Sequence, residues 1–295
     1  MSLITLVKER DVADQIGRVF KRPRLEASVP LLVPPGSRRF TLVGTAFDYL
    51  LRFYIKRINP FAVDRKWVAE GALSDPFSPI LHDAIYDPYT QTNEYKQTDQ
   101  TRAVERIIHK AKCEHDAYIQ SGRITDELLT SVLCLAQIDP MMRAGYVDRE
   151  LGLTHEEDVQ DLKQMISIAK PQYFKARDLC LLNPRFGKAS QLVGGAHADL
   201  FLDDTLIDIK VTTKLELHSE TLHQLIGYVA LNAISAIGDT TPRPVIAKAG
   251  VYFARHGYLF TFQISELIEG AAFESFVIWF QERARQKSAG PSRTM

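Results

Sequence analysis

The sequence has few cysteines, no excess of charge of either sign and no long apolar run. Its three cysteines are scattered, which excludes a disulfide framework and a Cys-x-x-Cys metal site. No apolar run is long enough to span a membrane, and charged residues come too early for a secretory signal peptide. These absences predict a cytoplasmic protein with three reduced, buried thiols and no membrane partner.

Charge is balanced, because 36 lysine and arginine residues stand against 36 aspartate and glutamate residues. Overall charge therefore does not predict a nucleic-acid partner, and any attraction to phosphate must come from a local patch. Basic residues cluster at 21–24, 37–39 and 52–57. They either form such a patch, facing a partner's phosphates, or are merely solvated. The chain lacks a GxxxxGK[ST] loop, so it has no evident ATP-driven motor of its own.

The pattern of apolar and turn-forming residues divides the chain into five segments. Apolar residues follow helical spacing up to Pro60, which ends the first clear helix. Thr154 and Glu157 predict a capping box in a later run of helices, and Gly257 predicts the turn of a late hairpin. The predicted segments are an N-terminal arm with loops (1–43), a first core helix (44–60), a mainly helical insertion (61–178), a core of strands and helices (179–286) and a flexible tail (287–295).

The segment GGAHADLFLDDTLIDIKVT, residues 194–212, places acidic residues among strand-forming apolar ones. If residues 203–204 form a two-residue turn, Asp199 faces Asp208 across an antiparallel ladder. Like charges about 4.5–5.5 Å apart are destabilising there. Lys210 projects from the same face because it lies two residues after Asp208. Two carboxylates and a lysine can hold a divalent cation and orient a water, and Mg²⁺ prefers such oxygen ligands.

The same residues allow a second register with a different meaning. If the turn slips by one residue, Asp199 faces Lys210 and the two form an ordinary cross-strand salt bridge. In the first register Lys210 can also be a simple counter-ion of the acids. That register places His197 opposite Lys210 on the ladder. His197 is then either a substrate contact or a structural or exposed histidine. Geometry alone leaves the metal site and the salt bridge open.

The helix expected after this hairpin carries a polar stripe. Gln224 and Tyr228 are four residues apart and share a face, with Glu220 one turn earlier. An amide and a phenol there can hydrogen-bond phosphate oxygens or hold an active-site lysine; the alternative is a partly exposed polar stripe. Arg255 and His256, near the later turn, are either phosphate contacts or ordinary turn residues.

Taken together, these motifs resemble a known superfamily. Asp199, the Asp208-Ile209-Lys210 tripeptide and the Gln224-x-x-x-Tyr228 element resemble the PD-(D/E)XK nucleases, in the RecB-type branch that carries QxxxY. The likeness covers about residues 189–262 and the helix at 44–58. It implies an α/β (α+β-like) fold with a restriction-endonuclease-like core, a central mixed sheet flanked by helices in the order α-β-β-β-α-β. The large helical segment is then an insertion.

The resemblance also implies a further acid from the first core helix. Asp48 is the best placed candidate, although it can instead form an i,i+4 ion pair with Arg52, and Glu70 is the second candidate. Some relatives carry an iron–sulfur cluster on four cysteines. The three cysteines here stand at unrelated positions, so no iron–sulfur cluster is expected.

The activity implied is hydrolysis of DNA phosphodiester bonds with Mg²⁺, for which Mn²⁺ substitutes. Asp48, Asp199, Asp208 and the carbonyl of Ile209 would be metal ligands. Lys210 would position the attacking water, and Gln224 with Tyr228 would hold the DNA backbone and the lysine. Such an enzyme fits phage defence, restriction or repair.

A second hypothesis is a non-catalytic, nuclease-like DNA-binding or scaffold subunit. It would act with a protein partner such as a helicase, an ATPase or another defence-system subunit. The complete Asp and Asp-x-Lys set favours the enzyme, because a decayed site usually loses one of these residues. A homodimer is compatible with the resemblance, and no sequence feature requires it.

Overall fold

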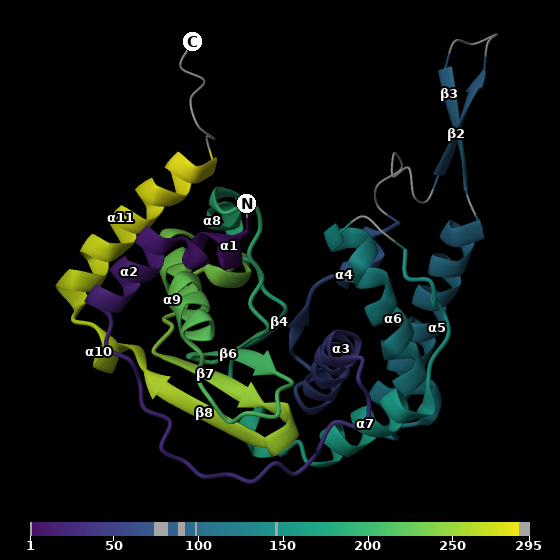
Figure 1. Ribbon diagram of the computed structural model, residues 1–295, viewed down its shortest axis with the longest axis horizontal. Helices are drawn as coiled ribbons and strands as arrows, with labels where there is room; N and C mark the ends of the chain where they lie inside the picture. The colour runs from purple at the N-terminus through teal and green to yellow at the C-terminus, as the bar shows by residue number, and fades with distance from the viewer. Residues whose placement is uncertain (1, 74–81, 88–91, 98, 145–146, 289–295) are drawn as a thin grey trace. The chain divides into compact units, whose positions relative to one another are not determined.

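The computed structural model describes residues 2–73, 82–87, 92–97, 99–144 and 147–288, which fold into two compact units (Figure 1). Unit 1 contains the chain up to Leu32, Phe61–Asp64 and the chain from Lys170 onward. Unit 2 contains Val33–Pro60 and Arg65–Ala169. Each is described by itself.

Unit 1 is built on a six-stranded mixed sheet with the order β1-β4-β5-β6-β7-β8. The β1–β4 and β6–β7 pairs are parallel and the other neighbours are antiparallel. A mixed sheet flanked by helices was predicted, and this part of the fold is confirmed. The strands are β1 (Val63–Asp64), β4 (Cys180–Leu182), β5 (Leu200–Leu202), β6 (Thr205–Lys210), β7 (Lys248–Phe253) and β8 (Tyr258–Gln263).

Helices cover one face of this sheet, with α9 (Ser219–Ile234) next to α1, α2, α8 and α11 (Figure 1). The apolar residues on that face, such as Leu206 and Val251, belong to one core cluster with α9. The predicted turn at Gly257 is confirmed, since this glycine has φ 54° between β7 and β8. The other helices of unit 1 are α1 (Leu3–Lys8), α2 (Arg10–Val19), α8 (Gly187–Leu192), α10 (Ile264–Leu267), α11 (Gly270–Ser288) and the 3₁₀ turns Pro171–Tyr173, Ile237–Asp239 and Ala254–His256.

The expectation of a loop-rich arm over residues 1–43 is wrong for its first half. Leu3, Leu6 and Val7 are buried on α1 and join the core cluster that contains α9. The spacing of these apolar residues is helical. The prediction of a loop-rich arm followed the basic clusters further along the segment instead of this spacing. The contact with α9 is close, because a Cβ at Gly227 would lie 2.9 Å from Leu3 Cδ1.

Unit 2 is mainly helical, and its helix α6 (Asp126–Ala144) packs against both α3 (Phe40–Ile58) and α5 (Asp99–Ser121). The helix predicted at 44–60 is present, but it starts at Phe40 and belongs to unit 2. The insertion boundaries 61–178 therefore differ from those observed. The remaining elements are α4 (Val68–Gly71), α7 (Glu156–Ser167) and an antiparallel hairpin of β2 (His82–Asp87) and β3 (Thr92–Gln97).

Two local predictions fail in unit 2. The N-cap of α7 is His155, so the capping box at Thr154 and Glu157 is wrong. Three acids in the first turn favour this start through the helix dipole. Cys113 is exposed on α5, whereas Cys134 and Cys180 are buried as expected.

Two further expectations concern the chain's ends and the membrane. Helix α11 continues to Ser288, and the rest of the predicted tail lies outside the described residues. Within the part of the chain that the structure describes, no helix has the length and apolar character needed to cross a membrane.

Candidate active site

The β5–β6 hairpin has the register that places its acids on one face. Phe201 pairs with Leu206 and Leu202 with Thr205, so residues 203–204 form the two-residue turn. The prediction of this register is confirmed, and the slipped register with Asp199 opposite Lys210 is wrong. Continuing the ladder past Leu200 brings Asp199 opposite Asp208.

Asp203 is suited to this turn by both its backbone and its side chain. Its φ of 54° lies in the left-handed region, which aspartate and asparagine tolerate better than most residues. Its carboxylate accepts the backbone N–H groups of Arg177, Asp178 and Leu179 at 2.9–3.2 Å. Burial alone would raise the pKa of Asp203, but these hydrogen bonds and the Arg177 charge lower it below its ordinary value.

We expect Asp203→Ala to lower the free energy of unfolding by about 2 kcal/mol, since it removes the acceptor and strains the left-handed backbone. Asp203→Asn keeps an acceptor and the backbone tolerance, and serves as the matched control. Because the folded-state pKa is lowered, the carboxylate's contribution is present above its ordinary pKa and lost as pH falls through the lower, folded-state value. Urea unfolding at pH 7 and pH 3 measures both effects; equal stability of the two variants at pH 7 would contradict this role.

The predicted catalytic residues meet at the end of β6. Asp208 is 3% exposed, and its Oδ2 lies 2.8 Å from Lys210 Nζ. Asp199 Oδ2 accepts the backbone N–H of Ile209 at 2.7 Å. The structure therefore brings both carboxylates and the lysine to one place in unit 1. The role of the Ile209 carbonyl as a metal ligand stays a prediction.

Lys210 is held in its charged form by the acids around it. Burial alone would lower the pKa of its ammonium group, but Asp208, Asp199 and Glu220 raise it above its ordinary value. Lys210 is therefore a cation at neutral pH and cannot serve as a proton acceptor there. It can donate hydrogen bonds and neutralise negative charge.

The QxxxY residues hold the loop that leads to Asp199. Gln224 Nε2 donates to the Tyr228 hydroxyl at 2.9 Å, and that hydroxyl donates to the backbone carbonyl of His197. The Tyr228 ring is buried and stacks on Phe186, with centroids 5.2 Å apart. In unit 1 these two residues therefore position backbone two residues before Asp199. Their contacts with DNA and with Lys210 stay predictions.

We expect Tyr228→Phe to lower the free energy of unfolding by about 1–2 kcal/mol, because it removes the hydroxyl from a buried hydrogen-bonded pair. It should also slow any reaction that depends on Asp199, since the preceding loop loses its anchor. Tyr258→Phe, at the start of β8, is the matched control, and its stability should change by less than about 0.5 kcal/mol. Equal stability of the two variants would show that the hydroxyl does not hold the loop.

His197 does not pair with Lys210. It forms an isolated bridge with Arg185, and its Nε2 accepts a hydrogen bond from Arg185 Nε at 3.1 Å. The prediction failed because β5 has a neighbour on each side, and His197 lies along the side of β4. His197 therefore has a protein partner in Arg185, and its contact with a substrate stays a prediction.

The two candidates for a first-helix acid lie in unit 2 and form ion pairs there. Asp48 Oδ2 is 2.6 Å from Arg52 Nη2, so the alternative i,i+4 pair is present. Glu70 Oε1 is 2.6 Å from Lys112 Nζ, and its other oxygen accepts the Trp67 N–H. Metal binding by either acid stays a prediction.

Several basic residues proposed to approach DNA have structural partners. Arg22 binds the Leu217 carbonyl and the Ser219 hydroxyl, and Arg39 pairs with Glu150 and Asp158. Others are buried or bound within their own unit. These are Arg52, Arg57, Arg255 and His256.

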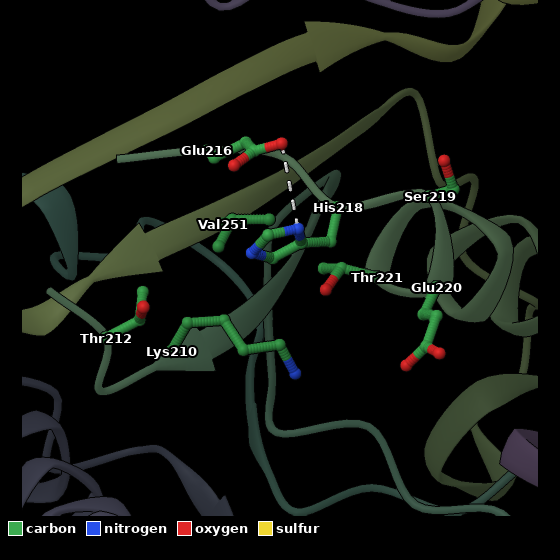
Figure 2. A pocket seen from close by; sticks show the side chains of 8 residues that line it. All are labelled: Lys210, Thr212, Glu216, His218, Ser219, Glu220, Thr221 and Val251. Carbon is green, nitrogen blue, oxygen red and sulfur yellow. Dashed lines mark ion pairs between the residues drawn. The ribbon is translucent and has the colours of Figure 1, made fainter. Parts of the chain in front are cut away.

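A pocket of about 390 Å³ opens beside Lys210, between the end of β6 and the first turn of α9 (Figure 2). The sequence analysis named Lys210 and Glu220 among the residues that line it, but it did not predict the pocket. The sequence signal that could have indicated this pocket was the start of a helix about two turns before the QxxxY element. The lining includes Lys210, Glu216, His218, Ser219, Glu220 and Thr221.

The donor set at Asp199 and Asp208 fits a hard divalent cation. Mg²⁺ in proteins is often bound by one or two carboxylates, with waters and substrate phosphate oxygens completing the shell. No set of three or more His, Cys, Asp or Glu side chains among the described residues is arranged to hold a metal. The proposed cation site in unit 1 therefore has two carboxylate ligands, Asp199 and Asp208.

Comparison with protein-family models, curated proteins and solved structures gives no significant match. The functional argument therefore depends on the residues and their geometry.

Proposed function

We propose that the protein is a Mg²⁺-dependent nuclease that hydrolyses DNA phosphodiester bonds. The observation that carries the proposal is the meeting of Asp199, Asp208 and Lys210 on one face of the β5–β6 hairpin. Each has the chemistry that the resemblance to PD-(D/E)XK nucleases requires. The element order of unit 1 adds support, because helices α1 and α2 precede β4, β5, β6, α9 and β7.

In the proposed mechanism, Asp199 and Asp208 hold the cation, and Mn²⁺ substitutes for Mg²⁺. A bound ion of this kind lowers the pKa of a water and stabilises charge on the phosphate. Water adds to phosphorus and one P–O bond breaks, which leaves a phosphate and a hydroxyl. Lys210 orients the water and offsets the developing charge, while Tyr228 keeps the loop before Asp199 in place.

The wild-type protein should cleave DNA with Mg²⁺ or Mn²⁺ and should be inactive when EDTA removes the metal. The test compares single- and double-stranded DNA and RNA, each as linear and circular molecules. Cleavage of circles identifies an endonuclease, and cleavage confined to linear molecules identifies an exonuclease. Activity that persists unchanged in EDTA would refute the metal-dependent mechanism.

A non-catalytic subunit is the second candidate. It is favoured by the internal engagement of both acids, since Asp199 accepts the Ile209 N–H and Asp208 pairs with Lys210. Under this hypothesis the protein binds DNA and acts through a helicase, an ATPase or another subunit of a defence system. Binding without cleavage of every substrate in the panel would support it.

A further inference from the structure

The pocket beside Lys210 contains the start of a long helix. The N-cap of α9 is His218, and the Leu222 N–H donates to the His218 carbonyl at this end of the helix. The N–H groups of the three residues before Leu222 have no acceptor within the helix. Together with the helix dipole, such groups attract anions.

Thr221 provides a second and independent observation. It is 7% exposed and lines the pocket, and Figure 2 shows its side chain directed into that space. Among the residues that the structure describes, its hydroxyl makes no hydrogen bond. This hydroxyl faces the pocket, and a ligand there would supply a hydrogen-bond partner for it.

The pocket lining contains charged groups of both signs. Lys210 contributes an ammonium group, whose Nζ lies 2.8 Å from Asp208 Oδ2. Two carboxylates also line the pocket, and each lies near a basic side chain. Glu216 lies 3.8 Å from the His218 ring, and Glu220 lies 3.0 Å from Lys8 Nζ. The hydrogen-bond donors at this pocket are the Lys210 ammonium group, the Thr221 hydroxyl and the N–H groups of the first turn of α9.

We propose that the first turn of α9, with Thr221 at its centre, binds a phosphate group of the substrate strand. The inference rests on the proposed nuclease function and adds a binding site to it. The phosphate belongs either to a phosphodiester beside the one cleaved or to a 5′ end. Both present the same anionic oxygens to Thr221, and Lys210 lies between this phosphate and the acids at Asp199 and Asp208.

The test is Thr221→Val, which removes the hydroxyl with little change of shape. Affinity is measured by fluorescence anisotropy with Ca²⁺ in place of Mg²⁺, on labelled oligonucleotides carrying a 5′-phosphate or a 5′-hydroxyl and on a circular competitor. Loss of one hydrogen bond to a charged group should weaken binding about 10–100-fold. The melting temperature should stay the same or rise, because the hydroxyl has no internal partner to lose.

Two further variants complete the test. Thr221→Ser keeps the hydroxyl and should restore affinity, whereas Thr41→Val, an exposed position in unit 2, should bind like wild type. Weakening with the 5′-phosphate alone identifies a terminal phosphate; weakening with all three probes identifies an internal phosphodiester.

The failure of this inference can be told apart from that of the proposed function. If wild type cleaves DNA and Thr221→Val binds every probe as tightly as wild type, the phosphate site is refuted and the nuclease stands. If wild type neither binds nor cleaves nucleic acid, inorganic phosphate is the remaining probe. Thermal stabilisation by phosphate that disappears in Thr221→Val then supports the site while the nuclease fails; no stabilisation refutes both.

Discussion

Replacement of Asp208 or Lys210 by alanine is expected to abolish DNA cleavage, with a loss of at least about 10²–10³-fold in rate. Asp208 is a buried carboxylate of the proposed metal site, and Lys210 is the only group that we assign to the attacking water. The measurement is the initial rate of cleavage with saturating Mg²⁺. Full activity in both variants would remove the basis of the nuclease proposal.

The double variant separates catalysis from a structural salt bridge. Each single change leaves a buried charge without its close partner, which should lower the free energy of unfolding. Asp208→Ala/Lys210→Ala removes both charges, so it should regain part of that stability and yet remain inactive. If the double variant recovers activity together with stability, the pair is structural and the reaction uses other residues.

Arg39→Ala is expected to lower the free energy of unfolding by about 3–5 kcal/mol, because it leaves a buried carboxylate without its cation. Arg39 pairs with Asp158, which is completely buried, and with Glu150 at 2.7 Å. All three residues lie in unit 2. Urea unfolding measures the change.

A matched control comes from the surface of the same unit. Arg102 pairs with Asp99 at 2.5 Å, but both side chains are largely exposed. Removing this pair by Arg102→Ala should change the free energy of unfolding far less than Arg39→Ala does, because water screens exposed ion pairs. Adding Asp158→Asn to Arg39→Ala should recover stability by removing the buried charge. A similar loss in Arg39→Ala and Arg102→Ala would show that burial does not set the effect.

The hairpin at the site could be predicted because several local signals agree there. Two adjacent turn-forming acids set the register, and the alternation of apolar residues decides which face Asp208 takes. A turn one residue later would have placed Asp199 opposite Lys210 instead of Asp208. The register of this hairpin could therefore be predicted from local sequence, without knowledge of distant contacts.

The rest of the site depends on contacts between distant segments. The bond from Tyr228 to the His197 carbonyl joins residues 31 apart in the chain, and spacing on one helix does not reveal it. The sequence around Thr221 does not distinguish it from other helical threonines, and only the folded structure places it at the pocket. The same limit explains the mistaken arm at residues 1–43, because α1 is stable only against α9, and short isolated helices are marginal in water.

The packing of α1 on α9 also has a consequence during biosynthesis. Roughly 200 residues separate these helices, so about 10–40 s pass between their synthesis at ordinary elongation rates. Over that interval Leu3, Leu6 and Val7 have no α9 to bury them. These apolar side chains stay without that cover on the nascent chain, and α1 can dock only after α9 has been synthesised.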